Sequence, residues 1–202
     1  MGRNESGEHR MKYTDDQLIN RVQTHADGFD GWRKGVHDIW VRSNADKMDA
    51  FDDKVYTFVA LKDGETPEFR MVCTGTSNAG SYGLKHFDKY NPKGCAVLES
   101  NRYVFESHFY GRHKNYRAYR QGKGFPYYRD DDRDNRAEEI GQVYNDIIYA
   151  NCHRAHARHT STRIYNWSVA CLVRNRPRQW RAWLTYMDRR PLSVAILREF
   201  WA

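Results

Sequence analysis

The chain has 202 residues, a mass of 24.0 kDa and a net charge of +7 at pH 7. Its Trp count of 6 and Tyr count of 14 exclude a disordered chain and predict one hydrophobic core. We predict a disordered tail over residues 1–13 and a single domain over residues 14–202. No run of about 18 apolar residues occurs, so we expect no membrane span, and the positive charge favours an anionic partner.

The first predicted element is a helix. Thr14 and Gln17 have the spacing of a capping box, and a partial apolar stripe follows. Gly28 or Gly31 is expected to end the helix. Alternating apolar residues then predict strands at 38–43, 55–61, 68–73, 95–99, 102–110, 116–121 and 125–129.

The C-terminal part is rich in arginine. Pro177 suits the first turn of a helix, whose buried face is predicted to consist of Trp180, Trp183, Leu184 and Met187. A closing strand is predicted at 192–200. Arginines with interleaved aromatics can also indicate nucleic-acid binding. Because the aromatics fall on the buried face, we favour a basic solvent face, and nucleic acid is a less favoured partner that is not excluded.

Three patterns could indicate a cofactor, and we predict none from them. The segment from Thr74 to Gly80 lacks the Gly-Lys-Ser/Thr end of a phosphate loop. The turn from Asp130 to Asp134 lacks the glycine and the final glutamate of a calcium loop, so we interpret it as a structural turn. His153, His156 and His159 are spaced like metal ligands, but they follow one another into a loop that sets no common face, so no metal is predicted.

A histidine and a cysteine mark the remaining feature. The segments Asn151–Arg154 and Trp167–Val173 are predicted strands joined by a polar loop. Such strands can place His153 beside Cys171, and a thiol becomes a useful nucleophile when a neighbouring base takes its proton. The alternative is that Cys171, flanked by apolar neighbours, is an ordinary core residue. The spacing by itself leaves both interpretations open.

The residues around Cys171 resemble a known signature. The segment 168–173, after a strand with a His, resembles the L,D-transpeptidase motif, in which a His and a loop precede Ser-His-Gly-Cys, an apolar residue and a basic one. The chain resembles even more a group of uncharacterised, largely phage- and prophage-encoded proteins with a Trp-Ser-Ala-Gly-Cys-Gln-Val strand. That likeness extends to Ile39–Ser43, Phe51–Asp53, Thr74–Thr76, Tyr90–Gly94, Gly111–Lys114 and Tyr128–Asp130.

The resemblance implies a fold and a chemistry. The expected fold is mostly β (α+β), a curved or barrel-like mixed sheet of the L,D-transpeptidase type with an N-terminal helix and a helix after the Cys strand. The expected activity is cysteine-dependent transfer or hydrolysis on peptidoglycan stem peptides. Cys171 would be the nucleophile and His153 the base, with the N–H groups of Ala170 and Cys171 stabilising an oxyanion. Ser168 completes the catalytic set, and the expected substrate contacts are Asn151, Arg154, Arg174, His113 and Trp167.

Departures from the motif keep two other functions open. Ala170 replaces the motif's Gly, Val169 its second His, and Val173 its basic residue. A phage structural or adaptor protein that keeps the fold without catalysis is therefore one alternative, and a basic nucleic-acid-binding protein is the other. The expected partners are stem peptides, anionic wall polymers or other virion proteins. Since no signal peptide is visible, we expect the host cytoplasm or the virion, with action at the cell envelope if the chain is an enzyme.

Overall fold

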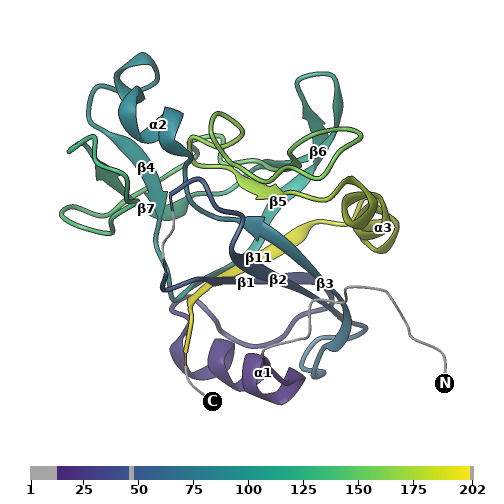
Figure 1. Cartoon of the computed structure of the whole chain (residues 1–202). Helices are drawn as coiled ribbons and strands as arrows, with labels where there is room; N and C mark the ends of the chain where they lie inside the picture. Colours follow the sequence, from purple (N-terminus) through teal and green to yellow (C-terminus); the bar gives the residue numbers. More distant parts are fainter. Residues whose placement is uncertain (1–12, 46–47, 201–202) are drawn as a thin grey trace, which may run out of the picture.

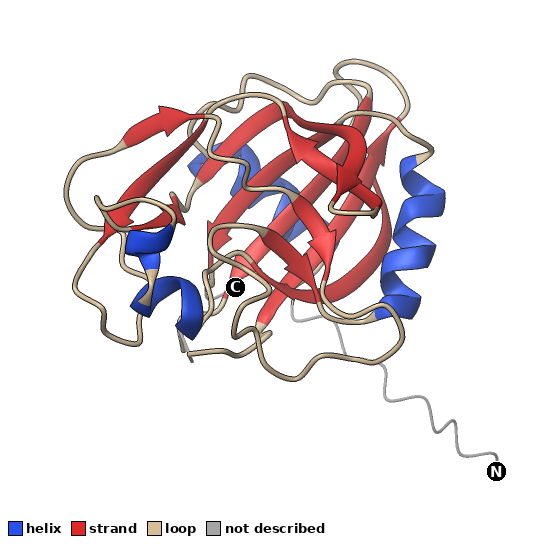
Figure 2. Ribbon diagram, turned by 90° about the horizontal axis from the view of Figure 1, so that it is seen from above, coloured by secondary structure: helices blue, strands red, loops and turns tan. Residues whose placement is uncertain are grey.

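The protein is described by a computed structural model that covers residues 13–45 and 48–200. Its strands form a closed eight-stranded barrel beside a three-stranded sheet (Figures 1 and 2). The barrel strands, in spatial order, are β1 (Gly35–Arg42), β11 (Leu192–Arg198), β5 (Arg102–His113), β6 (Tyr116–Gln121), β9 (Cys152–Arg154), β10 (Leu172–Arg174), β3 (Glu68–Thr76) and β2 (Asp53–Ala60). The small sheet contains β4 (Cys95–Leu98), β7 (Phe125–Asp130) and β8 (Tyr144–Asp146).

The helices are α1 (Asp15–His25), α2 (Ser81–Lys85), the 3-10 helix η1 (Phe87–Lys89) and α3 (Pro177–Met187). In the barrel, β1 pairs in parallel with β11 and β9 in parallel with β10, while the other pairs are antiparallel. The predicted mostly β fold, a curved mixed sheet with an N-terminal helix and a helix after the Cys strand, is thus confirmed. None of the helices in residues 13–45 and 48–200 is long and apolar enough to cross a membrane.

Helix α1 begins where the sequence predicts. The Thr14 side chain accepts the N–H of Gln17 (3.2 Å), and the Gln17 side chain accepts the N–H of Thr14 (2.8 Å). The predicted end at Gly28 or Gly31 is wrong, because the helix stops at His25 and residue 27 then pairs with the start of β5. Gly28 lies just beyond, with a φ of 85° and space for no side chain against Tyr103.

The expected tail over residues 1–13 is corrected at its last residue. Tyr13 is 3% exposed and stacks on Phe200 with 4.3 Å between ring centroids. Residues 1–12, the rest of that expectation, lie outside the described residues. Tyr13 joins the apolar cluster that α1 forms with the outer faces of β1 and β11, in which Ile39 and Leu197 are buried. Packing therefore anchors the start of the domain.

A buried ion pair occupies the barrel interior. Asp38 on β1 and Arg174 on β10 are both 0% exposed and bonded to each other. The indole N–H of Trp183, on α3, donates to Asp38 (3.2 Å), and the Arg174 guanidinium lies 4.0 Å from the Trp183 ring centroid. These contacts offset the desolvation of both charges, and they attach α3 to one end of the barrel (Figure 1).

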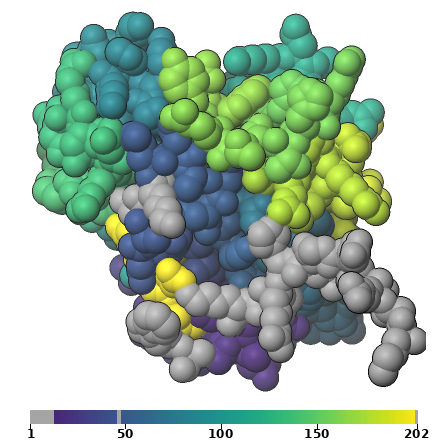
Figure 3. All heavy atoms as spheres, in the orientation of Figure 1, coloured from purple at the N-terminus to yellow at the C-terminus, as the bar shows by residue number. Residues whose placement is uncertain are grey.

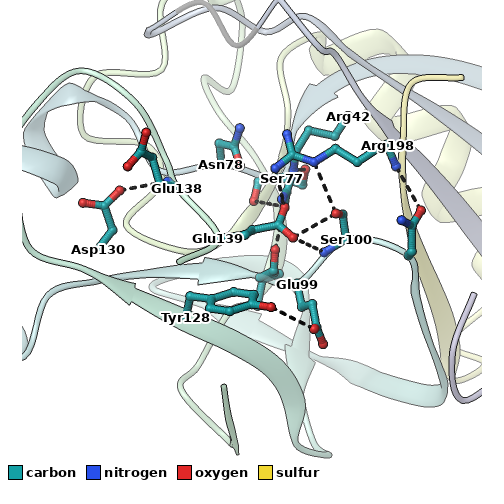
Figure 4. Close-up of polar contacts among 12 residues, drawn as sticks. Arg42, Ser77, Asn78, Glu99, Ser100, Tyr128, Asp130, Glu138, Glu139 and Arg198 are labelled. Atoms are coloured by element: carbon teal, nitrogen blue, oxygen red, sulfur yellow. Dashed lines mark hydrogen bonds and ion pairs between the residues drawn. The ribbon is translucent and has the colours of Figure 1, made fainter. Parts of the chain in front are cut away.

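A second ion-pair network joins the barrel to the segment between β7 and β8 of the small sheet (Figure 4). Glu139 accepts from Arg42 of β1 (2.6 Å) and from Arg198 of β11 (2.8 Å). Its other oxygen accepts the N–H and the hydroxyl of Ser100 (3.0 and 2.9 Å). Although burial by itself raises the pKa of Glu139, the charge of Arg42 and the bonds from Ser100 bring that pKa below its ordinary value.

The acidic segment after β7 is held by its own carboxylates. Asp130 accepts the N–H of Glu138 (2.9 Å), Asp132 that of Asp134 (2.9 Å), and Asp134 that of Arg136 (2.6 Å). Carboxylates that accept local backbone N–H groups are typical of turns. These contacts agree with the interpretation of the segment as a structural turn.

Candidate functional site

The two segments that bear His153 and Cys171 are neighbours in the barrel. Strands β9 and β10 pair in parallel, with His153 opposite Val173. The prediction of a strand over Trp167–Val173 is wrong in its first half, because β10 begins only at Leu172. The Ser168 hydroxyl donates to the carbonyl of Cys171 (2.9 Å), which closes a turn and leaves Cys171 as the last residue before the strand.

Strand alternation places the two side chains on one face. Cys152 and Leu172 both point into the core cluster of the barrel. Since successive side chains of a strand point to opposite faces, His153 and Cys171 share the other face. The N–H of Leu172 bonds to the carbonyl of Asn151 (3.0 Å), so Cys171 lies beside Asn151, two residues from His153.

The His153 ring is held in one tautomer. Its Nδ1 lies 2.8 Å from the carbonyl oxygen of Arg154. A carbonyl only accepts, so Nδ1 bears the proton and Nε2 has the lone pair. The Tyr116 hydroxyl lies 3.0 Å from Nδ1 and donates to the same carbonyl (3.2 Å). Nε2 is buried and has no hydrogen-bond partner among the described residues, which leaves it available as a proton acceptor.

His113 covers His153. The two rings are stacked, with centroids 4.1 Å apart and planes within 6°. Burial, and then the neighbouring His113, lower the pKa of His153 to about 3, and burial also lowers the pKa of His113. The pair is therefore neutral at pH 7. The Nδ2 of Asn151 lies 3.4 Å from Nδ1 of His113, so Asn151, His113 and His153 are brought together as the resemblance implies.

Cys171 opens onto an apolar pocket. The pocket has a volume of about 340 Å³ and lies between the small sheet and the turn at Cys171. Its walls include Ile147, Ile148, Tyr149 and Ala170, and Arg129 supplies a positive charge. The Cys171 thiol is partly buried and donates to the carbonyl of Tyr149 (3.7 Å). In this conformation the thiol points toward the pocket and not toward His153.

Burial keeps the thiol protonated at rest. It raises the pKa of Cys171 to about 11, although a backbone hydrogen bond from Asn151 and the charge of Lys114 act in the opposite direction. The Cys171 thiol and the His153 imidazole are therefore both neutral at pH 7. Such a pair works by general-base transfer of the proton during attack, and not through a thiolate formed beforehand.

Backbone donors lie next to the thiol. Among the described residues, neither the N–H of Ala170 nor that of Cys171 donates a hydrogen bond. Ala170 does not have a positive φ, and its methyl group is buried in the core cluster. The replacement of the motif's Gly by Ala170 thus needs no strained backbone. Both N–H groups are thus without a hydrogen-bond acceptor among the described residues.

The residues around this turn are held by packing. Ser168 is buried, and its hydroxyl bonds the Cys171 carbonyl, so its role in the structure is to shape the turn. The Val169 carbonyl accepts from Cys95 (3.2 Å). Trp167 lies on the loop before the turn, edge-on to His156 at 6.4 Å, and does not line the pocket. These contacts connect the turn to the small sheet.

Besides Trp167, two more expected substrate contacts lie away from the pocket. Arg174 is 0% exposed and pairs with Asp38 inside the barrel, where a substrate does not reach it. Arg154 is partly buried, lies over the ring of Tyr116 at 4.1 Å, and lines a separate groove beside α3. In β10, Arg174 follows Val173 and its side chain points to the inner face of the barrel. Because Arg174 comes three residues after Cys171, alternation directs the two side chains to opposite faces.

The sequence did not point to three residues that contact the site. Tyr116 bonds the His153 ring, Tyr149 accepts from the thiol, and Arg129 lines the pocket. They come from three distant segments, so only strand pairing brings them to Cys171. Tyr116 opens β6 after the turn at residues 114 and 115, and an orientation toward residue 153 needs the pairing of β6 with β9.

Within the described residues, no three His, Cys, Asp or Glu side chains lie close enough together to hold a metal ion. Comparison of the chain with protein-family models, with curated proteins and with solved structures found no match. The site is therefore described by its own geometry: Cys171 at the mouth of a pocket, and His153, with an unpaired Nε2, on the neighbouring strand β9.

Proposed function

We propose that this chain is a cysteine-dependent acyl-transfer enzyme of the L,D-transpeptidase type that acts on peptidoglycan stem peptides. The observation that supports it most is the state of His153. Its Nδ1 proton is held by the Arg154 carbonyl (2.8 Å), while Nε2 is buried without a partner on the face that it shares with Cys171. Leaving a buried polar atom unpaired costs free energy, so the unpaired Nε2 supports a role for this atom as a proton acceptor.

The reaction follows from these groups. Rotation about the Cα–Cβ bond turns Sγ of Cys171 from the Tyr149 carbonyl toward Nε2. Nε2 takes the thiol proton as Sγ attacks a peptide carbonyl, and the N–H groups of Ala170 and Cys171 bind the resulting oxyanion. The C–N bond then breaks, the leaving amine takes the proton from Nε2, and a thioester remains. An amine or water attacks that thioester and releases Cys171 as the thiol.

The pocket beside Cys171 suits a peptide with a carboxylate. Its walls at Ile147, Ile148 and Val169 are apolar, and Arg129 is its cation. The guanidinium of Arg129 already donates to the carbonyl of Gly94 (3.0 Å), which holds it in place. A fixed guanidinium in a partly apolar pocket favours a bidentate contact with a carboxylate.

A second proposal is a structural or adaptor protein that keeps the fold without catalysis. It is favoured by the thiol itself, which has a pKa raised to about 11 and points to Tyr149 instead of Nε2. In this proposal, burial of Cys171 serves packing alone. The two proposals differ in one measurable property, the formation of a covalent bond to Cys171.

The test is intact-protein mass spectrometry after incubation with a synthetic peptidoglycan stem peptide. The enzyme proposal predicts an acyl adduct on Cys171 that is absent in Cys171→Ala and formed much more slowly in His153→Gln. His159→Gln is the matched control, because His159 is exposed on the loop and its ring and N–H contact His156 in its own segment. Absence of an adduct from the folded wild-type chain would reject the enzyme and favour the structural protein.

A further inference from the structure

A basic groove lies beside the candidate site and has no role in the proposed reaction. It has a volume of about 730 Å³ and runs between the β5–β6 hairpin and α3. Figure 3 shows the segment between β9 and β10, in yellow-green, on the surface next to α3. The groove walls contain the arginines Arg112, Arg117, Arg154 and Arg181 and the apolar or aromatic residues Tyr110, Tyr116, Trp180 and Leu184.

The charge of this groove is not balanced by protein groups. None of the residues that line it is acidic. Among the described ion pairs, none involves Arg112, Arg117, Arg154 or Arg181. Elsewhere in the fold, arginines such as Arg42 and Arg174 are paired with carboxylates. Four unpaired guanidinium groups around one groove attract an anion that has several charges.

Tyrosine rings that stack with arginines at the groove favour one kind of anionic polymer over others. The Arg154 guanidinium lies over the ring of Tyr116 at 4.1 Å. The guanidinium of Arg189, which does not itself line the groove, lies over the ring of Tyr110 at 5.3 Å. Each pair presents a flat platform, and nucleobases stack on aromatic rings and on guanidinium planes. Wall polymers that alternate phosphate with glycerol or sugar have no flat group for these platforms. A duplex hides its bases, so a single strand fits best.

We infer that the groove between the β5–β6 hairpin and α3 binds single-stranded nucleic acid, with phosphates on the arginines of both walls and bases on the Tyr–Arg platforms. Because the platform of Tyr116 also contacts His153, a strand in the groove would lie next to the candidate site. This inference does not rest on the proposed enzyme activity, and Cys171→Ala is expected to bind the strand as the wild type does.

The test is fluorescence anisotropy with a labelled oligothymidylate of ~15 nucleotides, a length that covers a typical single-strand site. We expect the logarithm of the binding constant to fall with the logarithm of salt concentration with a slope of about −3, since four phosphate contacts each contribute about −0.7. In Arg117→Ala/Arg181→Ala, which removes one arginine from each wall, we expect roughly tenfold weaker binding and a slope reduced by about 1.4.

The matched control is Arg120→Ala/Arg136→Ala. It removes the same charge from exposed arginines, one of them also on β6, that do not line the groove. Binding by the control within about twofold of the wild type supports the groove. An equal loss in both double variants would overturn the proposal in favour of diffuse attraction. So would binding of duplex DNA, a glycerol-phosphate polymer or polyglutamate as tightly as the oligothymidylate, or no binding at ~50 mM salt.

Discussion

Two polar regions of this molecule use their side chains in opposite ways. In the network of Figure 4, Glu139 accepts from Arg42, Arg198 and both donors of Ser100. In the candidate site, Nε2 of His153 accepts from no described residue, and the N–H groups of Ala170 and Cys171 donate to none. In the first region, both oxygens of Glu139 accept hydrogen bonds that stabilise the fold. The second region keeps part of its hydrogen-bonding capacity unused, as a site for chemistry requires.

The two regions also differ in what their titrating groups do at neutral pH. Neighbouring charges lower the pKa of Glu139 against the effect of burial, so the carboxylate stays charged. Burial dominates at His153 and Cys171, whose pKa values move to about 3 and about 11, so both stay neutral. The charged network attaches the segment between β7 and β8 to the barrel, while His153 and Cys171 both rest in their neutral forms. The predictions below test this contrast.

The largest effect is expected from Arg42→Met. Removing this guanidinium leaves the mostly buried carboxylate of Glu139 with less compensation, and we expect the free energy of unfolding to fall by about 3–5 kcal/mol. Denaturant titration measures it, with Arg33→Met as the control, because its pair with Asp30 is exposed and is expected to matter by less than about 0.5 kcal/mol. The loss of stability in Arg42→Met should shrink below pH ~4.5, where Glu139 takes up a proton. A cost that is independent of pH would contradict the electrostatic explanation.

The next effect concerns His153→Gln. The glutamine can still donate to the Arg154 carbonyl, but it offers no base, so acylation of Cys171 is expected to slow by about 10²–10⁴-fold. Stopped-flow or quenched mass spectrometry gives the rate, and circular dichroism verifies the fold. His159→Gln should match the wild type. An unchanged acylation rate in His153→Gln would remove His153 from the mechanism.

The pH dependence of stability gives a third prediction, with a definite sign. His153 has an ordinary pKa of 6.5 and a folded pKa of about 3. Between these values the unfolded chain binds more protons, so the contribution of His153 to stability is present above pH 6.5 and is lost as the pH falls toward 3. Unfolding curves at several pH values should therefore show a shallower acid dependence in His153→Gln than in the wild type. Equal slopes would mean that His153 is not buried as a neutral ring.

The thiol provides a fourth prediction. With a pKa of about 11, Cys171 should react with iodoacetamide at a rate that rises about tenfold per pH unit from about pH 7 to 9, without a plateau. Residue-resolved mass spectrometry separates Cys171 from the other cysteines. A plateau near neutral pH would indicate a thiolate–imidazolium pair, contrary to the neutral pair described above.

The smallest effect is expected from Ala170→Gly, which restores the residue of the resembled motif. Ala170 has no positive φ and its methyl group packs in the core. The change should lower the free energy of unfolding by about 1 kcal/mol through chain entropy and lost packing. Acylation should change little. A large gain of activity would instead show that Ala170 blocks catalysis.

Local sequence signals predicted much of the fold correctly. Thr14 and Gln17 cap α1, Pro177 starts α3, and strands β2 to β7 begin within a few residues of their predicted positions. Three details were predicted incorrectly because residues outside the local pattern decide them. Residue 101 bonds the chain just after α1, Phe200 stacks on Tyr13, and the Ser168 hydroxyl forms the turn before β10. The short elements α2, η1 and β8 had no local signal.

The same division applies to the candidate site and to the molecule as a whole. The sequence alone determined which residue types are available: a cysteine and a histidine on neighbouring segments, caps, alternation and excess arginine. Only the tertiary structure decided their surroundings. The pairing of β9 with β10 put His153 and Cys171 on one face, whereas alternation put Arg174 inside the barrel with Asp38. Burial and partners come from distant segments, and they set the pKa of each group, so chemistry here depends on contacts that no local pattern records.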